Sequence, residues 1–249
     1  MDWARQCAVV IPCRNEAASI GEIVSAVRRQ LPSVIVVNDG STDGTADRAI
    51  AAGAETLRHP ANQGKGAALR TGWQRARARG FAWALTMDGD GQHAPEDIAA
   101  FLACAEATGA ALVIGNRMDH ANAMPWLRRQ VNRWMSRRLS NLAGVPLPDS
   151  QCGFRLVNLA ALSRVQLAAQ QFEVESEMLV AFLTARCQVA FIPVRVIYES
   201  QASKIRPLWD TFRWLRWWRA QHRKRYPVLP SSCFCLRGSA VEKHASRLK

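Results

Sequence analysis

The chain has 249 residues, of which 49% are hydrophobic and 21% charged, and its formal net charge is +13. This composition is that of a globular protein and excludes a chain that is disordered throughout. The length fits one large domain, or one domain with a tail. Twelve Lys and Arg but only two acidic residues lie between Ser200 and Lys249, so the positive charge predicts a C-terminal surface for anionic lipid or nucleic acid.

Cysteine usage and hydropathy predict the compartment. The seven cysteines are scattered, several of them inside apolar runs, as expected of reduced thiols in the cytosol. The N-terminal segment has only a short apolar run and does not resemble a signal peptide. No window approaches the about 18 uninterrupted apolar residues of a membrane span. We therefore expect a cytoplasmic protein that associates peripherally with a membrane.

Short apolar runs alternate with helical patterns along most of the chain. Runs such as Cys7–Pro12 are typical of strands buried in a parallel sheet, and apolar residues at helical spacing follow them. This alternation predicts an α/β fold with one mostly parallel sheet covered by helices on both faces. The expected strands are Cys7–Pro12, Val34–Val37, Glu55–Arg58, Phe81–Met87, Ala110–Ile114 and Val189–Ile197, with Pro193 placing the last near an edge. The expected helices are Ile20–Gln30, Thr45–Ala52, about 66–79, about 95–107, Pro125–Leu142, segments within Ala160–Arg186 broken around Gln171 and Phe172, and Pro207–Tyr226.

Polar loops follow four of the expected strands. They are Pro12–Glu16, Asn38–Ser41, Asp88–Asp90 and Gly115–Arg117. Because the carboxyl ends of parallel strands share one edge of the sheet, we expect the acidic and basic groups of these loops to converge on one crevice, where open α/β folds bind ligands.

Asp88 and Asp90 lie one residue apart at the end of the strand Phe81–Met87. Paired carboxylates there suit a hard divalent cation, since Mg²⁺ is usually held by one or two carboxylates together with substrate phosphates and water. Asp and Gly are also ordinary turn residues, so a simple polar turn is the alternative. The convergence of four polar loops favours a site that holds a metal-bound diphosphate.

The motifs in these loops resemble the ordered series of family-two glycosyltransferases, which transfer a sugar from a nucleoside diphosphate. Within that family the chain most resembles the dolichol-phosphate mannosyltransferase-like branch, whose acceptor is a polyprenyl phosphate. The resemblance covers residues 7–206 and implies the A-type glycosyltransferase fold, a single Rossmann-like sheet flanked by helices. The motifs that carry it are Val10–Glu16, Val37–Thr45, Asn62–Gly66, Met87–His93 and Gly115–Arg117.

The resemblance implies a nucleoside-diphosphate sugar as donor and Mg²⁺ or Mn²⁺ as cofactor. The residues implied to bind the donor are Pro12, Asn15, Glu16, Asp39, Lys65 and Asp88. Those implied to hold the metal are Asp88, Asp90 and Gln92, with Asp90 counted among the catalytic residues. Ordinary structural roles are the alternatives: Glu16 as an acid in a helix first turn, Asp39 in an Asx turn and Lys65 as a solvated lysine.

The acceptor end is expected to be basic. Arg117, Arg128 and Arg129 resemble the positions at which the branch holds the acceptor phosphate, and the planar fork of arginine binds phosphate oxygens bidentately. A solvated helix face is the alternative for these arginines. An ionised lipid phosphate needs no base, so we expect inversion by one in-line displacement. A hydroxyl-bearing lipid or glycan acceptor would need a base, for which Asp149 is the candidate.

Two later segments bear on the same site. Glu175 is a candidate for an acid that faces the site, although acids are equally common at a helix start. The Ser203–Arg206 segment resembles the Ser-Lys element of the family, but the residues before it depart from the commoner pattern. The catalytic residues expected for transfer are Asp90, Arg117 and, with a hydroxyl acceptor, Asp149.

The C-terminal region divides into a helix and a tail. We expect a catalytic domain at 1–206, a basic Trp-rich amphipathic helix at 207–226 and a flexible tail at 227–249. Such a helix suits an anchor on an anionic membrane surface, and a helix packed on the catalytic domain is the alternative. We expect no nucleic-acid partner, given the enzyme motifs. A non-catalytic module that binds a nucleotide sugar and a membrane is the competing function.

Overall fold

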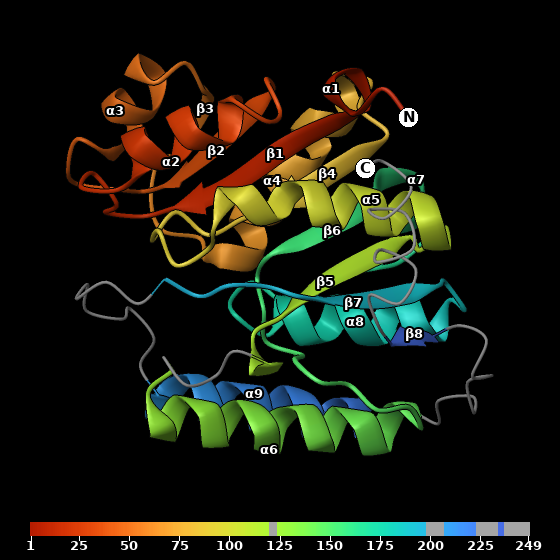
Figure 1. The fold of residues 1–249 in the computed structure, drawn as a ribbon. Coiled ribbons are helices and arrows are strands. Elements are labelled where there is room, and N and C mark those ends of the chain that lie inside the picture. Colours follow the sequence, from red (N-terminus) through yellow and green to blue (C-terminus); the bar gives the residue numbers. More distant parts are fainter. Residues whose placement is uncertain (120–123, 198–206, 223–233, 237–249) are drawn as a thin grey trace.

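The computed structural model describes residues 1–119, 124–197, 207–222 and 234–236 (Figure 1). The Ser203–Arg206 element predicted from the sequence lies outside these residues, as does most of the predicted tail. Eight strands form one sheet in the order β3-β2-β1-β4-β6-β5-β7-β8. The strands are β1 (Cys7–Cys13), β2 (Val34–Asp39), β3 (Glu55–His59), β4 (Trp83–Thr86), β5 (Leu112–Asn116), β6 (Arg155–Asn158), β7 (Val189–Pro193) and β8 (Phe234–Leu236).

The central strands are continuous apolar runs because both of their faces are covered. Every residue of β1 is buried except Pro12, which is half-buried, and all six residues of β2 are buried. β1 pairs in parallel with β2 and with β4, in a register that sets Val9 against Val34 and Leu85. Among the described strands, only β6 runs antiparallel to its neighbours, β4 and β5. The predicted α/β fold with a mostly parallel sheet is confirmed.

Helices cover both faces of the sheet (Figure 1). α2 packs on β2, and α5 packs on β5 to β7 on the same side, while α4 packs on β1, β2 and β4 from behind. α4 approaches closely because Gly72 has no side chain: a Cβ there would lie 2.3 Å from Val10 Cγ1. The helices are α1 (Trp3–Gln6), α2 (Ile20–Arg28), α3 (Thr45–Ala51), α4 (Lys65–Ala78), α5 (Ile98–Thr108, after a 3₁₀ turn at Pro95–Asp97), α6 (Trp126–Ala143), α7 (Leu159–Leu162), α8 (Val174–Thr184) and α9 (Pro207–His222).

α6 and α9 lie side by side as a further layer at one end of the molecule (Figure 1). The rings of Trp134 in α6 and Trp214 in α9 are 5.5 Å apart between centroids. Trp214 is 2% exposed, and its Nε1 donates to Ser176 Oγ of α8 at 2.8 Å. Arg138 stacks on Trp134 and Trp218. The aromatic side chains of α9 complete an apolar contact with α6 and α8. α9 is therefore packed on the catalytic domain, which was the alternative to a Trp-rich helix that anchors the protein on a membrane.

Several predicted elements need correction. β6 was not expected, since Arg155–Asn158 is short and opens with a charged residue. Residues 163–173 are not helical, although helical segments were predicted there. β8 falls in the predicted flexible tail, where Phe234–Leu236 pair in parallel with Val189–Phe191 of β7. The last expected strand ends at Pro193, four residues early. Of the described helices, none is both long and apolar enough to cross a membrane.

Candidate active site

The aspartate loop that follows β4 lies beside the start of α4. Lys65, the first residue of α4, places its Nζ 2.6 Å from Asp88 Oδ1 and 2.7 Å from Glu175 Oε1 of α8. His93 Nε2 lies 3.5 Å from the other oxygen of Asp88. The Lys65 side chain is 14% exposed and that of Glu175 only 5%. The fold thus joins three predicted residues, far apart in sequence, into one charged cluster in which Glu175 is buried and Lys65 and Asp88 are partly buried.

Lys65 and Asp88 stabilise each other's ionised form. Burial alone would raise the pKa of Asp88, but the Lys65 ammonium and the hydrogen bond from His93 outweigh burial and hold that pKa well below its usual range. Burial would lower the pKa of Lys65, but Asp88 and Glu175 raise it above its usual value. The Lys65 ammonium group therefore lies between two acidic side chains. Glu175 Oε2 is buried and has no hydrogen-bond partner in the described part of the chain.

Glycines make room for the cluster. A Cβ on Gly153 would lie 2.7 Å from Asp88 Oδ2 and 2.9 Å from Lys65 Nζ. Gly64, at φ +97°, precedes α4, and Gly66 N donates to Gln170 O at 2.8 Å. Lys65 Nζ also lies 5.6 Å from the centroid of the Phe172 ring. The loop that opens α4 is thus held against the segment before α8, so Lys65 has a defined position.

The predicted nucleoside-binding residues lie on the loops after β1 and β2. Asn15, at φ 51°, accepts a hydrogen bond at Oδ1 from Thr42 N, and its own backbone N donates to Ser41 Oγ. Glu16 N donates to Thr45 Oγ1 at 2.8 Å. The two loops are therefore tied together, with Glu16 only partly buried. Pro12 lies at the carboxyl end of β1, beside Val37 of β2.

Asp39 is buried and hydrogen-bonded to other groups of the protein. It is 4% exposed. Its Oδ1 accepts from Gln63 N and its Oδ2 from Gly64 N, each at 2.8 Å, and His59 Nδ1 lies 2.8 Å from Oδ1. Asp39 therefore fixes the loop that presents Lys65, which gives it a positioning role whether or not it also contacts a nucleoside.

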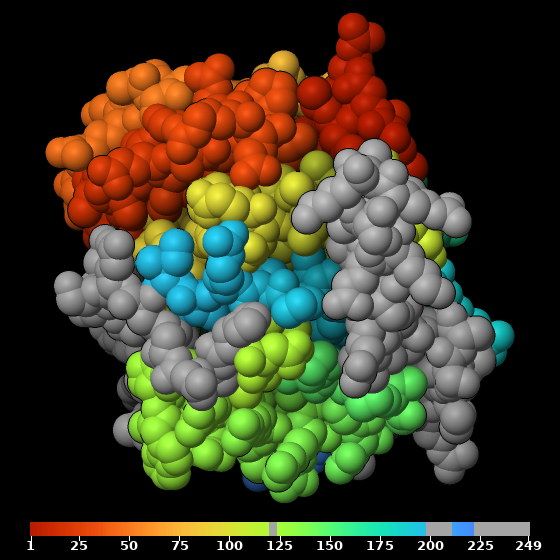
Figure 2. Space-filling view, in the orientation of Figure 1, coloured from red at the N-terminus to blue at the C-terminus, as the bar shows by residue number. Residues whose placement is uncertain are grey.

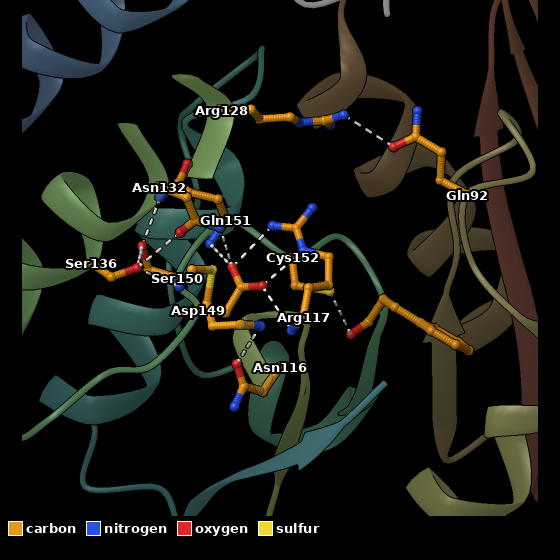
Figure 3. A network of polar contacts seen from close by, with 12 residues as sticks. Gln92, Asn116, Arg117, Arg128, Asn132, Ser136, Asp149, Ser150, Gln151 and Cys152 are labelled. Carbon is orange, nitrogen blue, oxygen red and sulfur yellow. Dashed lines mark hydrogen bonds and ion pairs between the residues drawn. The ribbon is translucent and has the colours of Figure 1, made fainter. Parts of the chain in front are cut away.

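The second half of the aspartate loop reaches α6. Asp90 is partly exposed, and its Oδ1 accepts from Gln92 N at 3.1 Å. Gln92 Oε1 accepts from Arg128 Nη1 at 3.2 Å (Figure 3). Arg129, the next residue of α6, has a buried Nε without a hydrogen-bond partner among the described groups. The basic start of α6 thus lies against the loop that carries the two aspartates.

Arg117, after β5, is clamped by Asp149 (Figure 3). Its Nε donates to Oδ2 at 2.7 Å and its Nη2 to Oδ1 at 2.9 Å, while its backbone N also donates to Oδ2. Asp149 is 0% exposed and also accepts from Asn132 Nδ2 and from Gln151 N. Burial would raise the pKa of Asp149, but the Arg117 guanidinium and the hydrogen bonds lower it. An ionised, fully bonded carboxylate of this kind is poorly suited to take a proton from an acceptor.

The network continues from this pair to α9. Asn132 Oδ1 accepts from Ser136 Oγ, which lies 3.1 Å from Ser150 Oγ. Gln151 Nε2 donates to Ser150 Oγ and to Ser176 Oγ, the hydroxyl that accepts from Trp214. A continuous chain of hydrogen bonds therefore connects Arg117 with the helix pair α6 and α9.

Comparison with known proteins identifies the family. Residues 8–165 match the model of Glycosyl transferase family 2. The chain belongs to this family. It is 33% identical over 172 residues to polyprenol monophosphomannose synthase of Mycolicibacterium smegmatis, covering 65% of this chain and 64% of the relative. It is 29% identical over 220 residues to UDP-N-acetylglucosamine--dolichyl-phosphate N-acetylglucosaminyltransferase of Methanococcus voltae, covering 77% and 86%.

A solved structure shares the fold of this glycosyltransferase. Glucosyl-3-phosphoglycerate synthase of Mycobacterium tuberculosis, in complex with Mn²⁺, UDP and phosphoglyceric acid, superposes with a TM-score of 0.67 at 22% identity, covering 91% of this chain and 80% of that one. The predicted A-type fold and the predicted family, with its polyprenyl-phosphate branch, are confirmed.

The residues of this glycosyltransferase fit the divalent cation that the family implies. No group of three or more His, Cys, Asp and Glu in the described part of the chain forms a complete metal site. A Mg²⁺ or Mn²⁺ ion that shares its coordination with a diphosphate needs only one or two carboxylates. Asp88 and Asp90 supply these, and Asp90 is partly exposed with hydrogen bonding to only one of its oxygens within the described residues.

Sequence reasoning missed three residues that shape the site. His93 is 3% exposed beside Asp88, with its Nδ1 buried and unpartnered among the described residues. Asn132 binds Asp149, and Arg155, 1% exposed, donates to the carbonyls of Ser150, Cys152 and Glu175. His93 ends the motif Met87–His93, which could have singled it out, whereas Arg155 lies outside the five motifs. Asn132 had no such signal, since its role depends on how α6 packs.

Proposed function

We propose that this family 2 glycosyltransferase transfers a sugar to a polyprenyl phosphate at the cytosolic face of a membrane, with inversion at the anomeric carbon. The observation that carries the proposal is the contact between Arg128 and Gln92, which sets the arginines at the start of α6 beside the aspartate loop. A cationic acceptor site next to a diphosphate site suits an anionic acceptor. The activities for which the polyprenyl- and dolichyl-phosphate relatives are named support the same acceptor class.

The donor end is built to hold a diphosphate. In this proposal Asp88, Asp90 and Gln92 would hold Mg²⁺ or Mn²⁺, and the cation would supply neutralisation of charge on the leaving nucleoside diphosphate. Lys65 lies at the start of a helix, where backbone N–H groups and the helix dipole favour phosphate. Glu16, Asn15 and Pro12 lie on the neighbouring loops and contact the nucleoside.

The acceptor end orients the nucleophile. The second pKa of a phosphate monoester is about 6, so the acceptor is largely ionised at neutral pH. A phosphate oxygen attacks the anomeric carbon as the bond from that carbon to the diphosphate oxygen breaks, and the electron pair leaves with the nucleoside diphosphate. Arg117, Arg128 and Arg129 align the phosphate. Proximity and electrostatic stabilisation supply the rate enhancement.

The geometry around Asp149 favours a phosphate acceptor over a hydroxyl acceptor. A hydroxyl needs a base within hydrogen-bond reach of the attacking oxygen. Asp149 is fully buried, with both oxygens bonded to Arg117, and its pKa is lowered. In the proposed reaction Asp149 acts by orienting Arg117 and does not accept a proton.

The test is product identification with several donors. The full chain is incubated with a polyprenyl phosphate, a panel of UDP and GDP sugars and Mg²⁺ or Mn²⁺, and the lipid extract is analysed by mass spectrometry. We expect a mild-acid-labile sugar phosphate, lost in Asp90→Asn and retained in Asp47→Asn, an exposed carboxylate paired with Arg58. Product only with a hydroxyl-bearing lipid would contradict the phosphate acceptor. Donor binding without turnover across the panel would support the non-catalytic module instead.

A further inference from the structure

The start of α6 exposes two large apolar side chains in a row. Trp126 is 66% exposed and Leu127 58% exposed. Within the described residues no other neighbouring pair of large hydrophobic side chains is exposed in this way. In Figure 2 the green atoms of this part of the chain form the lower edge of the molecule. An exposed tryptophan beside a leucine suits insertion into the boundary between lipid headgroups and acyl chains.

The outward face of α6 is otherwise cationic. The helix has five arginines and no acidic residue. At 100° per residue, Arg133 and Arg137 lie on the same stripe as Trp126, at positions i+7 and i+11. Both arginines are exposed, whereas Met135, Leu139 and other residues of the opposite stripe are buried. An apolar pair therefore heads a row of exposed positive charge.

α9 repeats this arrangement beside α6. Phe212 is 58% exposed, and Arg216 and Arg219 follow it as exposed residues at i+4 and i+7. The two helices form one layer at the end of the molecule (Figure 1). Asp210 is the one acidic residue in the sequence of either helix. The outward stripes of α6 and α9 are thus both basic, with apolar residues near the start of each helix.

This surface adjoins the acceptor end of the site. Trp126 and Leu127 lie within about one helical turn, or ~5 Å, of Arg128 and Arg129. Arg128 in turn contacts Gln92 of the aspartate loop. A lipid whose chain lies against Trp126 can therefore present its headgroup phosphate to the arginines of the proposed acceptor site.

We propose that the protein docks on an anionic lipid bilayer through the outward stripes of α6 and α9, with Trp126 and Leu127 entering the lipid. The proposal deepens the proposed function, because it says which face delivers a membrane-bound acceptor. It also relocates the membrane contact from the tryptophans of α9, since Trp214 is buried in the protein. Charge complementarity selects the partner: a basic, nearly acid-free surface attracts an anionic leaflet, with about a fivefold gain in binding for each arginine near the surface.

Vesicle binding by the full chain tests the surface. We compare vesicles of phosphatidylcholine with about 30 mol% phosphatidylglycerol against vesicles of pure phosphatidylcholine. The first set has about a third anionic lipid and so mimics a charged leaflet. We expect co-sedimentation with the anionic vesicles only. The double variant Arg133→Glu/Arg137→Glu should bind at least ~25-fold more weakly, from two arginines at about fivefold each. The matched control Arg48→Glu/Arg77→Glu reverses two exposed arginines of α3 and α4 and should bind like wild type.

The apolar pair is tested separately. Trp126→Ala/Leu127→Ala should weaken vesicle binding. Brominated acyl chains should quench the part of the wild-type fluorescence that is missing in Trp126→Ala. Ile50→Ala, which truncates another exposed apolar residue, is the control. Equal sedimentation of the surface variants and their controls would overturn the proposal. So would equal binding to neutral vesicles, or binding to nucleic acid in preference to anionic vesicles.

A soluble acceptor separates this proposal from the proposed function. With a short-chain prenyl phosphate in solution, Arg133→Glu/Arg137→Glu should transfer sugar at the wild-type rate, because it lies outside the site. Loss of vesicle binding with retained transfer supports the docking surface. Absence of transfer by wild type under every condition would refute the proposed function, while the vesicle data would still decide the docking surface.

Discussion

Asp149→Asn removes the charge that holds Arg117 and changes little else in shape. Arg117 is 7% exposed and donates three hydrogen bonds to Asp149. Removing one partner of a buried ion pair costs about 3–5 kcal/mol, because the other charge stays buried without compensation. In a chain of this size 1 kcal/mol shifts Tm by about 2–4 °C. We therefore expect Tm to fall by about 6–20 °C, the product of these two ranges.

Thermal unfolding of Asp149→Asn and of Asp47→Asn measures this difference. Asp47 pairs with Arg58, but both side chains are more than half exposed, so its substitution should cost less than about 1 kcal/mol. Transfer to the acceptor should also fall about 100-fold in kcat/KM, since a displaced Arg117 misaligns the phosphate. Equal Tm shifts in the two variants would refute the argument that the Arg117–Asp149 pair is energetically buried.

The pH dependence has a definite sign. The pKa of Asp149 in the folded protein is lowered, so its contribution is fully present above the unfolded value of about 3.9 and is lost as pH falls through the folded pKa. The Tm difference between wild type and Asp149→Asn should therefore be constant between about pH 6 and 8 and shrink below about pH 4. A difference that grows on acidification would contradict this assignment.

Three further substitutions probe the donor cluster and the helix layer. Gly153→Ala brings a Cβ within 3 Å of Asp88 and Lys65. We expect about a tenfold or greater loss of donor affinity, because charge-assisted contacts are displaced, and a smaller effect on Tm. Titration calorimetry with a nucleoside diphosphate measures the affinity. Lys65→Met leaves Asp88 and Glu175 without their shared cation, so donor affinity and Tm should both fall. An unchanged affinity would show that Lys65 is not part of the donor site. Trp214→Ala empties the contact among α6, α8 and α9 and should lower stability by about 3–5 kcal/mol, whereas an unchanged denaturation midpoint would show that α9 packs only weakly.

Local pattern predicted most of the sheet because buried parallel strands are continuous apolar runs. β1, β2, β4 and β5 were expected close to their observed positions for this reason. The antiparallel strand β6 was not predicted, because its four residues include Arg155 and it is buried by neighbouring strands on both sides. β8 was not predicted either, because a strand of three residues is too short to show a hydrophobic period.

The sequence by itself determined which groups gather at the carboxyl edge, because alternating strands and helices predict a mostly parallel sheet and each loop carries its polar residues to one edge of it. Only the tertiary structure decided what those groups do for one another. Lys65 bridges Asp88 and Glu175, and Asp149 is buried against Arg117, because helices and loops that are distant in sequence pack together. The inward orientation of Trp214 could not be predicted either, because an amphipathic pattern shows that a helix has an apolar face but not what that face packs against.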